Sequence, residues 1–496
     1  MSCPVSLRTL LEGWCADVPC EDLPDLLVPD LLVTGLELDS RRVGAGQAFV
    51  AVAGRQAHGM NFAAQAEARG AVVILHDGLA DLPRLRIPAV AVPDLGARLS
   101  SLGARFYHAP SDHLSVAGVT GTNGKTSTAH FIAQSWQRSG GDAGLIGTIG
   151  YGPFNALQTA RMTTPGPIAL QAMLAECLDR GVKRVAMEVS SHALDQGRCD
   201  DVAFDVAVFT NLSRDHLDYH GTMAAYEAAK RRLFIDCRPR FAVINADDPV
   251  GKKLLSEVAN GTQVLSYGSG GGELRAAIQQ MNSAGMTLEL SGPWGGGRLH
   301  TGLLGAFNVS NLLAAAGTLA LLGMPWCQVM HQLEIMHPVP GRMHCLGGEH
   351  DQPVVVVDYA HTPDALEQAL HALRAHLHGR LLCVFGCGGD RDAGKRPMMA
   401  CIAESLADRL VLTTDNPRSE PSADIFRDML AGLRAPKAAC VVEDRGEAIR
   451  QAVAQSAAGD IVLIAGKGHE AWQEIRGQKI PFSDEAAVRA ALEDAA

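Results

Sequence analysis

The segment 121–126, with the sequence Gly-Thr-Asn-Gly-Lys-Thr, has the residue types that hold the phosphate groups of a nucleotide. It follows an apolar run at residues 114–120 and precedes a segment of helical character at residues 127–138. Glycines between a strand and a helix let backbone N–H groups close around phosphates, and the helix N-terminus adds partial positive charge. Lys125 is expected to reach the β- and γ-phosphate oxygens, and the hydroxyl of Thr126 can ligate Mg²⁺.

The spacing of this loop departs from the standard phosphate loop, because Val119 stands five residues before Gly124 where that loop has a glycine. A glycine-containing surface turn is therefore the alternative interpretation. The strand pattern before the loop and the helix pattern after it favour nucleotide binding. The loop predicts bound ATP or GTP, but it does not indicate what the phosphate is used for.

Polar residues also follow two apolar runs of the central region, at the strand ends where open α/β sheets bind ligands. Glu188 lies at the end of one run, and the run 206–209 leads into a polar segment that contains His216. A carboxylate and a histidine beside a triphosphate loop can hold metal ions, although an ordinary helix cap or surface acid has the same pattern. Lys230, in the helical segment 226–232, has by pattern alone the character of a solvated lysine.

Four apolar runs near the C-terminus each end in a polar or glycine-rich loop. These loops begin at residues 358, 386, 415 and 466. Arg391 and Arg418 can grip carboxylates bidentately, whereas Asp415 and Glu470 can hold an ammonium group. Strand-end turns with surface ion pairs are the alternative, but four such loops at successive strand ends favour a ligand site. A rim with both signs of charge suits a zwitterionic ligand such as an amino acid.

The elements that must position these residues form an α/β pattern in three regions, residues 1–110, 111–337 and 338–496, with Pro338 and Pro340-Gly341 at the second junction. Continuous apolar runs that alternate with helices imply a mostly parallel sheet covered on both faces. The runs predicted as strands are residues 71–75, 89–92, 114–120, 184–189, 206–209, 241–244, 354–357, 381–385, 410–412 and 461–464.

Two glycine-rich patches, residues 268–272 and 292–297, are predicted to be exposed loops that join extra strands. A second phosphate site is the alternative for each patch. No helix with a lysine follows either of them, so the loop interpretation is favoured.

The composition bounds the class of protein. A chain of 496 residues exceeds what one hydrophobic core serves, so two to three domains are expected. The net charge of −11 disfavours nucleic acid as a partner. The 12 cysteines are scattered without a C-x-x-C pair, which indicates a reducing compartment. No signal peptide is predicted, and the leucine-rich segment 23–38 is interrupted by Asp and Pro and cannot span a membrane. These properties are typical of a cytosolic α/β enzyme.

Four motifs taken together resemble the bacterial Mur ligases. They are the segments 121–126, 187–192 (Met-Glu-Val-Ser-Ser-His), 209–216 (Phe-Thr-Asn-Leu-Ser-Arg-Asp-His) and 415–418 (Asp-Asn-Pro-Arg). The resemblance covers nearly the whole chain. It implies a UDP-binding N-terminal domain at 1–110, a central ATP-binding domain at 111–337 with a phosphate-loop-type sheet, and a Rossmann-like, amino-acid-binding C-terminal domain at 338–496.

The resemblance also implies a reaction. ATP phosphorylates the free carboxylate of D-glutamate in UDP-N-acetylmuramoyl-L-alanyl-D-glutamate, and the amine of meso-diaminopimelate attacks the acyl phosphate. This is a step of peptidoglycan precursor synthesis. The implied cofactors are ATP and Mg²⁺, and the implied partners are these small molecules, without nucleic acid or membrane insertion. A cytoplasmic monomer is expected, with closure of the central and C-terminal domains around the substrates.

Site residues follow from the resemblance at matching positions. Those implied for ATP are Gly121, Thr122, Asn123, Gly124, Lys125, Thr126, Ser127, Asn308, Arg342, Asp358 and His361. Those implied for the UDP-linked substrate are Ser40, Arg55, Gln56, Ala57, Thr163, Thr164, Ser190, Gln196 and Arg198. Those implied for diaminopimelate are Arg391, Asp415, Asn416, Pro417, Arg418, Gly466 and Glu470. Those implied for Mg²⁺ are Thr126, Glu188, His216 and Lys230, the last as an N6-carboxylysine. Lys125, Lys230 and His216 are the implied catalytic residues.

Two positions depart from the pattern of some relatives. Met162 stands where some have Asn, and Arg55 stands where some have His. The Asp-Asn-Pro-Arg motif is the version associated with meso-diaminopimelate, whose second carboxylate suits the fork of Arg418. A folylpolyglutamate synthase and a non-catalytic nucleotide-binding protein are the alternatives. The 415–418 motif and the N-terminal region disfavour the first, and Lys125, Glu188, His216 and Lys230 disfavour the second.

Overall fold

The computed structural model describes residues 4–14, 31–54, 57–78, 84–160, 162–258, 261–349 and 352–494. The chain divides into two compact units. The first comprises Met1–Lys125, Trp136–Ile244 and Asp248–Val264, and the second comprises Thr126–Ser135, Asn245–Asp247 and Leu265–Ala496. The domain boundaries predicted at residues 110 and 337 stay a prediction. Among the described residues, no helix is long and apolar enough to cross a membrane.

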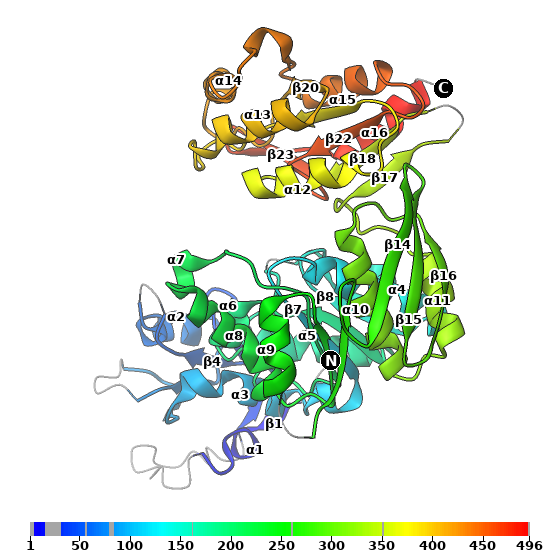
Figure 1. Ribbon diagram of the computed structural model, residues 1–496. Helices are drawn as coiled ribbons and strands as arrows, with labels where there is room; N and C mark the ends of the chain where they lie inside the picture. Colours follow the sequence, from blue (N-terminus) through cyan, green and yellow to red (C-terminus); the bar gives the residue numbers. More distant parts are fainter. Residues whose placement is uncertain are drawn as a thin grey trace. The chain divides into compact units, whose positions relative to one another are not determined.

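The first unit begins with a small α/β module (Figure 1). Its parallel sheet has the order β3-β4-β5-β6. The elements are β1 (Val5–Ser6), α1 (Leu7–Leu11), β2 (Leu32–Val33), β3 (Leu36–Glu37), β4 (Ala48–Ala51), α2 (Ala63–Ala68), β5 (Val73–His76), β6 (Ala89–Ala91) and α3 (Leu99–Phe106). The predicted strands at 71–75 and 89–92 are present with shifted ends, since β5 begins two residues later than predicted.

A larger sheet in the first unit carries the phosphate loop. Its strands have the order β12-β11-β7-β10-β8-β9 and are parallel except for β9. They are β7 (Ser115–Thr120), β8 (Ala143–Ile146), β9 (Tyr151–Pro153), β10 (Arg184–Glu188), β11 (Val206–Phe209) and β12 (Phe241–Asn245). The helices of this region are α4 (Lys125–Gly140), α5 (Pro167–Asp179), α6 (Ser191–Asp195), α7 (Leu217–His220), α8 (Met223–Ile235) and α9 (Pro249–Glu257). Because β7, β10 and β11 are parallel neighbours, their carboxyl ends lie at one edge of the sheet.

The second unit contains further strands in the order β16-β15-β14-β13, of which β14, β15 and β16 are antiparallel neighbours, whereas β13 pairs in parallel with β14. Its elements are β13 (Gln263–Gly268), β14 (Leu274–Asn282), β15 (Gly285–Gly292), β16 (Gly295–Thr301), α10 (Phe307–Leu321) and α11 (Trp326–Glu334). The prediction of a loop over 292–297 is wrong for most of that patch, because Gly292 pairs with Gly295 across a tight hairpin. Gly295 adopts a positive φ of 119°, which a glycine tolerates, and the strand therefore continues through the glycines.

The C-terminal part of the second unit is a sheet with helices on both faces. The order is β17-β18-β22-β19-β20-β21, parallel except for β17. Its strands are β17 (His344–Gly347), β18 (Val354–Asp358), β19 (Leu381–Phe385), β20 (Arg409–Leu412), β21 (Cys440–Val441) and β22 (Ile461–Ala465), with a separate hairpin of β23 (Trp472–Ile475) and β24 (Gln478–Pro481). Its helices are α12 (Pro363–Arg374), α13 (Lys395–Leu406), α14 (Ser422–Leu430), α15 (Arg445–Ala454) and α16 (Asp484–Asp494).

Alternate residues of these strands face two separate apolar cores. One core packs against α12, α13 and α14, and the other packs against α15 and α16, as Figure 1 shows for the two faces. This explains why the sequence has continuous apolar runs, since strands covered on both faces need apolar residues at every position. The α/β fold class with a mostly parallel central sheet is confirmed.

Candidate functional site

The phosphate loop connects β7 directly to α4. The helix begins at Lys125, two residues earlier than predicted, with Gly124 at a positive φ of 84° as its N-cap. Gly121 has a φ of 150°, and a Cβ atom there would lie 1.9 Å from Oγ1 of Thr210. The loop therefore requires glycine at position 121. Thr126 and Ser127 follow in the first turn of the helix and are half-buried.

Two lysines converge on one backbone oxygen of this loop. Lys125 Nζ donates to the carbonyl oxygens of Gly121, at 2.9 Å, and Thr122, at 2.8 Å. Lys230 Nζ donates to the same Gly121 oxygen at 2.7 Å. The pattern-based expectation that Lys230 is solvated is wrong, because the face of α8 that carries it packs inward and leaves it 2% exposed. Burial, and then the charge of Lys125, hold the pKa of Lys230 well below its ordinary value.

The segment after β11 forms hydrogen bonds with the phosphate loop. Oγ1 of Thr210 donates to the carbonyl of Asn123 at 2.6 Å. The backbone N–H of Asn123 donates to Oδ1 of Asn211 at 2.9 Å. The hydroxyls of Thr122 and Tyr226 lie 3.2 Å apart. These contacts hold the loop in its conformation.

Glu188 is buried at the end of β10, beside two of the residues implied for the UDP-linked substrate. Its Oε1 accepts a hydrogen bond from the N–H of Thr148 at 2.7 Å. The Thr148 hydroxyl lies 3.1 Å from that of Thr163. Thr164 Oγ1 donates to the carbonyl of Glu188 at 2.9 Å and accepts from the N–H of Ser190 at 3.0 Å. The carboxylate therefore shares one polar network with the threonines.

The same network extends to Gln196 and Arg198. Arg198 donates through Nη1 to the Thr164 carbonyl at 2.8 Å and through Nη2 to Oε1 of Gln196 at 2.6 Å. Gln196 donates to the Tyr219 hydroxyl at 2.9 Å. Met162 is 50% exposed, and its sulfur lies 3.8 Å from Nη1 of Arg198. Five of the implied substrate residues (Thr163, Thr164, Ser190, Gln196 and Arg198) thus lie together.

His216 caps α7 with a positive φ of 52°, and its side chain is 44% exposed. Its ring packs edge-on against His192, with centroids 4.9 Å apart. Burial, followed by the charges of His216 and His220, lowers the pKa of His192. Among the described residues, no group of three or more His, Cys, Asp or Glu side chains could hold a metal ion by itself.

The residues implied for the UDP end lie in the N-terminal module. Ser40 is buried, and its hydroxyl donates to Oε1 of Gln65 at 2.7 Å. Ala57 accepts a hydrogen bond from Gly54 through its carbonyl. Arg55 and Gln56 lie outside the described residues, so their predicted roles stay predictions.

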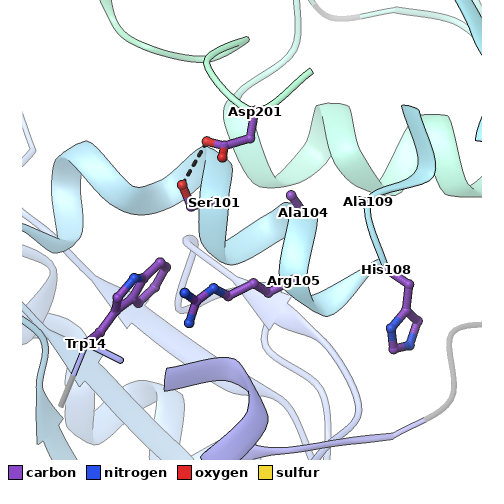
Figure 2. A pocket seen from close by; sticks show the side chains of 7 residues that line it. All are labelled: Trp14, Ser101, Ala104, Arg105, His108, Ala109 and Asp201. Carbon is purple, nitrogen blue, oxygen red and sulfur yellow. Dashed lines mark hydrogen bonds between the residues drawn. The ribbon is translucent and has the colours of Figure 1, made fainter. Parts of the chain in front are cut away.

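A cavity of about 340 Å³ lies elsewhere in the first unit (Figure 2). Its lining includes Trp14 and Arg105, whose guanidinium carbon lies 4.0 Å from the centroid of the Trp14 ring. Ser101 donates to Asp201 at its rim at 2.8 Å. None of the lining residues is among those predicted from the sequence to bind a substrate.

In the second unit, the residues implied for ATP surround Tyr359. Asp358 accepts from the N–H of Met343 at 2.7 Å, and burial raises the pKa of its carboxyl. The Arg342 guanidinium lies 4.9 Å from the Tyr359 ring centroid, and the His469 ring lies 5.4 Å from it. Nε of Arg342 and Nδ1 of His469 are buried without a hydrogen-bond partner. Two orphaned polar atoms around one aromatic ring fit a polar, flat ligand.

The other two implied ATP residues of this part of the chain, His361 and Asn308, differ in exposure. His361 is exposed and hydrogen-bonded through Nδ1 to the carbonyl oxygen of Tyr359 at 2.8 Å. Asn308 is buried in α10, where it donates to the Leu304 carbonyl and accepts from Asn311. Asn308 therefore orders the helix N-terminus in this structure.

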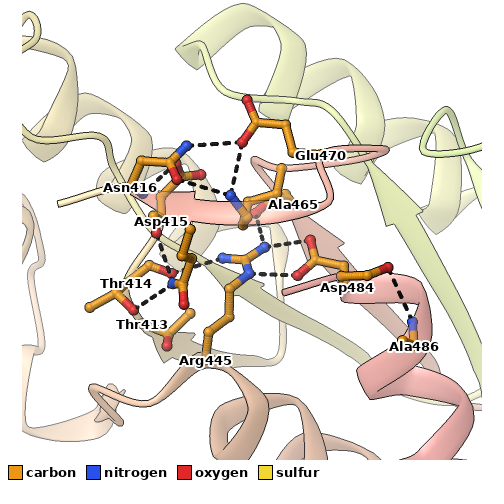
Figure 3. A network of polar contacts seen from close by, with 12 residues as sticks. Thr413, Thr414, Asp415, Asn416, Arg445, Ala465, Glu470, Asp484 and Ala486 are labelled. Carbon is orange, nitrogen blue, oxygen red and sulfur yellow. Dashed lines mark hydrogen bonds and ion pairs between the residues drawn. The ribbon is translucent and has the colours of Figure 1, made fainter. Parts of the chain in front are cut away.

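The four loops of the C-terminal sheet meet as predicted, because β18, β22, β19 and β20 are parallel neighbours. Asn416 Nδ2 donates to Oε2 of Glu470 at 2.9 Å (Figure 3). Gly466, with a φ of 118°, lies so close to Asp415 that an added Cβ would approach Oδ2 to 2.7 Å. Although burial opposes it, hydrogen bonds from Lys467 and Asn416 keep the pKa of Glu470 below its ordinary value.

The arginines of this rim differ in their surroundings. Arg418 has a positive φ of 53°, donates to the Gly389 carbonyl at 2.8 Å and faces Glu474 at 3.5 Å. Pro417 precedes it and accepts from the N–H of Glu420 through its carbonyl. Arg391 is exposed. Burial, followed by the charge of Glu470, raises the pKa of the nearby Tyr359 hydroxyl, and the charge of Arg391 opposes this rise.

Two residues of this network were not predicted from the sequence. Lys467 is fully buried and donates to both Asn416 and Glu470. Arg445 is fully buried against Asp484, at 2.6 and 2.8 Å, and donates to the carbonyls of Thr414 and Ala465. Figure 3 shows the Arg445 side chain beside Asp484 and Ala465. Lys467 lies inside a predicted loop and could have been noticed, but no local signal links Arg445 to a partner 39 residues away.

Comparisons with known proteins agree with this geometry. Models described as Mur ligase family, catalytic domain; Mur ligase middle domain; and Mur ligase, glutamate ligase domain match residues 32–107, 119–319 and 341–468. A protein of Xanthomonas campestris pv. campestris (strain 8004), named UDP-N-acetylmuramoyl-L-alanyl-D-glutamate–2,6-diaminopimelate ligase, is 51% identical over 464 residues, which cover 92% of this chain and 94% of the relative. A Pseudomonas aeruginosa protein of the same name is 50% identical over 90% of this chain and 93% of its own.

The resemblance extends to a solved structure described as that of a UDP-N-acetylmuramoyl-L-alanyl-D-glutamate–2,6-diaminopimelate ligase. It aligns with a TM-score of 0.74 at 35% sequence identity, and it covers 100% of this chain and 99% of the other. The family resemblance predicted from the four motifs is confirmed by matches that run along nearly the whole sequence. The chain belongs to the Mur ligase family.

Proposed function

We propose that this protein is an ATP-dependent ligase that joins meso-diaminopimelate to UDP-N-acetylmuramoyl-L-alanyl-D-glutamate during peptidoglycan precursor synthesis. ATP is converted to ADP and phosphate as the amide bond forms. The observation that carries the proposal is that two relatives with this activity in their names are 51% and 50% identical over nine-tenths of the chain. The mixed-charge rim at the C-terminal strand ends supports the choice of amino acid.

The proposed reaction has two steps. The γ-phosphoryl group of ATP passes to the free carboxylate of the D-glutamate residue, and ADP leaves. The amine of diaminopimelate then attacks the acyl carbon, loses a proton and expels phosphate. Neither step needs a side-chain nucleophile, so catalysis rests on positioning and charge neutralisation.

The phosphate loop is proposed to position the phosphates of ATP. Backbone N–H groups of residues 121–126 would surround the phosphates at the positive end of α4. Lys125 donates to carbonyls of its own loop in this structure, and the same ammonium group can turn to the β- and γ-phosphate oxygens of ATP. The braces from Thr210 and Asn211 keep the loop in shape while that exchange occurs.

Mg²⁺ is proposed as a cofactor, and the donors present fit it. Magnesium takes oxygen ligands and is usually held by one or two carboxylates together with substrate phosphates. Glu188 offers a buried carboxylate at a strand end, and Thr126 and His216 offer a hydroxyl and an imidazole. When bound, Mg²⁺ would neutralise charge on the phosphates.

Lys230 is proposed to extend this donor set as a carbamate. Its neutral amine adds to the carbon of CO₂ and releases a proton, which gives an N6-carboxylysine with two oxygens. The lowered pKa of Lys230 supports this proposal, because only the unprotonated amine is nucleophilic.

The two remaining substrates would be held by residues already described. The network of Thr164, Ser190, Gln196 and Arg198 is proposed to contact the muramoyl-peptide, and Ser40 the UDP end. Arg418 and Asp415 are proposed to bind the carboxylate and ammonium groups of diaminopimelate. The enzyme is proposed to act in the cytoplasm, where ATP and UDP-linked sugars are available.

Phosphate release from ATP tests the proposed function. With the UDP-linked dipeptide present, release should depend on the amino acid, and meso-diaminopimelate should give at least about tenfold higher kcat/KM than lysine or glutamate. Lys125→Ala is the inactive control and should retain the wild-type circular dichroism spectrum. Phosphate release that does not respond to any amino acid would contradict the ligase function.

A further inference from the structure

Lys467 is a buried cation at the base of the proposed amino-acid pocket. It lies two residues after the end of β22, and none of its side chain is exposed. Its Nζ donates to Oδ1 of Asn416 at 3.1 Å and to Oε2 of Glu470 at 2.8 Å. A lysine is almost never fully buried unless it is paired. Its two partners are both residues implied for diaminopimelate, so Lys467 acts on the pocket through them.

The first effect of Lys467 is on orientation. An ammonium group can only donate hydrogen bonds, so Asn416 must present its oxygen to Lys467. The backbone N–H of Glu474 donates to that same oxygen at 2.9 Å. The amide nitrogen of Asn416 is thereby turned to Oε2 of Glu470, at 2.9 Å. Lys467 therefore contacts both the amide and the carboxylate, and it holds the amide orientation together with the N–H of Glu474.

This arrangement leaves one carboxylate oxygen for a ligand. Oε2 of Glu470 receives hydrogen bonds from both Lys467 and Asn416. No residue in the described part of the chain donates to Oε1 of Glu470, and the side chain is 22% exposed. Oε1 is therefore open to an ammonium group of the ligand.

The second effect of Lys467 is on charge. Asp415 and Glu470 both contribute negative charge to the pocket, and Lys467 offsets one of them. Diaminopimelate carries two carboxylates and two ammonium groups, whereas lysine lacks the second carboxylate. Without Lys467 the pocket would be more negative by one charge. This would repel the second carboxylate of diaminopimelate and favour the net positive charge of lysine.

We infer that Lys467 is a positioning residue that determines amino-acid specificity, because it orients Glu470 and Asn416 and favours a ligand with a second carboxylate. This inference rests on the proposed ligase function. Lys467 acts through Glu470 and Asn416 and does not itself take part in the transfer of phosphate or the formation of the amide bond.

The test compares kcat/KM for meso-diaminopimelate and for L-lysine in Lys467→Met and wild type. The diaminopimelate value should fall about 30-fold or more, since one partner of a buried charge pair is removed, while the lysine value falls at most about threefold. The KM for ATP should stay within about twofold of wild type. Lys467→Arg keeps the charge and should restore most of the preference.

Two further variants make the result specific. Lys479→Met is the matched control, because Lys479 is an exposed lysine of β24 that stacks on Trp472 and does not contact the pocket. Lys479→Met should leave kcat/KM unchanged for both meso-diaminopimelate and L-lysine. Lys467→Gln retains a hydrogen-bond donor without charge, and it should lower the preference in the same direction if Lys467→Met does not fold.

Four outcomes would overturn the inference. An unchanged preference in Lys467→Met or Lys467→Gln, or an equal fall for both amino acids and for ATP, would assign Lys467 a purely structural role. A loss of preference in Lys467→Arg as large as that in Lys467→Met would exclude the role of charge. Wild-type enzyme without any amino-acid dependence would remove the proposed function and this inference with it, whereas the other outcomes leave the proposed function intact.

Discussion

At the scale of single residues, the clearest feature is that Lys125 and Lys230 share the carbonyl oxygen of Gly121. Two ammonium groups on one acceptor repel each other, and the buried one is the easier to neutralise. Burial and the charge of Lys125 lower the pKa of Lys230, which favours the proposed carbamate at Lys230 and leaves Lys125 for the proposed contact with the phosphates. The same loop oxygen thus serves two lysines with different proposed roles.

The lowered pKa of Lys230 predicts a pH-dependent stability. Between its lowered folded value and the ordinary value of 10.5, the unfolded state binds one more proton than the folded state, so stability rises with pH in this window. In Lys230→Met no ammonium group has to lose its proton on folding, so the free-energy cost of that step is absent. Gly121 keeps its hydrogen bond from Lys125. In CO₂-free buffer without substrates, the variant should melt about 2 °C higher than wild type at pH 7.5, and the gap should narrow towards pH 10.

Differential scanning fluorimetry across this pH range measures the effect, and ligation should be abolished in the same variant. Lys183→Met is the control, because Lys183 is exposed and its replacement should leave the melting temperature unchanged at every pH. A gap that widens with rising pH would contradict the assigned direction of the pKa shift.

At the scale of elements, a buried ion pair joins α15 and α16 to the ends of two strands. Arg445 begins α15, Asp484 begins α16, and both side chains are fully buried. Arg445 donates to the carbonyls of Thr414 and Ala465, the residues that precede Asp415 and Gly466. The pair therefore fixes the two strand ends that carry the proposed amino-acid pocket.

Asp484→Asn should leave the Arg445 charge buried without a counter-ion. We expect the free energy of unfolding to fall by about 3–5 kcal/mol, measured by urea denaturation, and the KM for diaminopimelate to rise more than that for ATP. Asp424→Asn removes one partner of an exposed pair with Arg427 and should cost less than about 1 kcal/mol. An equal loss of unfolding free energy in Asp484→Asn and Asp424→Asn would contradict the stabilising role of the buried Arg445–Asp484 pair.

At the scale of the whole molecule, we expect a monomer of 52.4 kDa. A net charge of −11 disfavours self-association at low ionic strength. Light scattering after gel filtration should give one species of this mass with and without ATP. A mass near twice this value at micromolar concentration would contradict the expectation.

The sequence predicts those parts of the molecule that depend on local pattern. The phosphate loop, the parallel strands and the four polar loops of the C-terminal sheet follow from glycine spacing and apolar runs, and the structure has them with ends shifted by one or two residues. Lys230 could not be placed by its helix pattern, because its burial depends on which face of α8 packs inward. The pairing of Arg445 with Asp484 joins distant segments, which no local pattern encodes.

The crowded backbone at Gly121 has a consequence for inhibitors of this enzyme. Any side chain there would collide with Thr210, whose hydroxyl is itself bonded to Asn123. A compound that binds against the bare backbone at this position would contact a residue that the protein cannot exchange for another. Resistance to such a compound would have to arise at neighbouring positions. Substitutions there would disturb the hydrogen bonds from Thr210 and Asn211 that hold the loop.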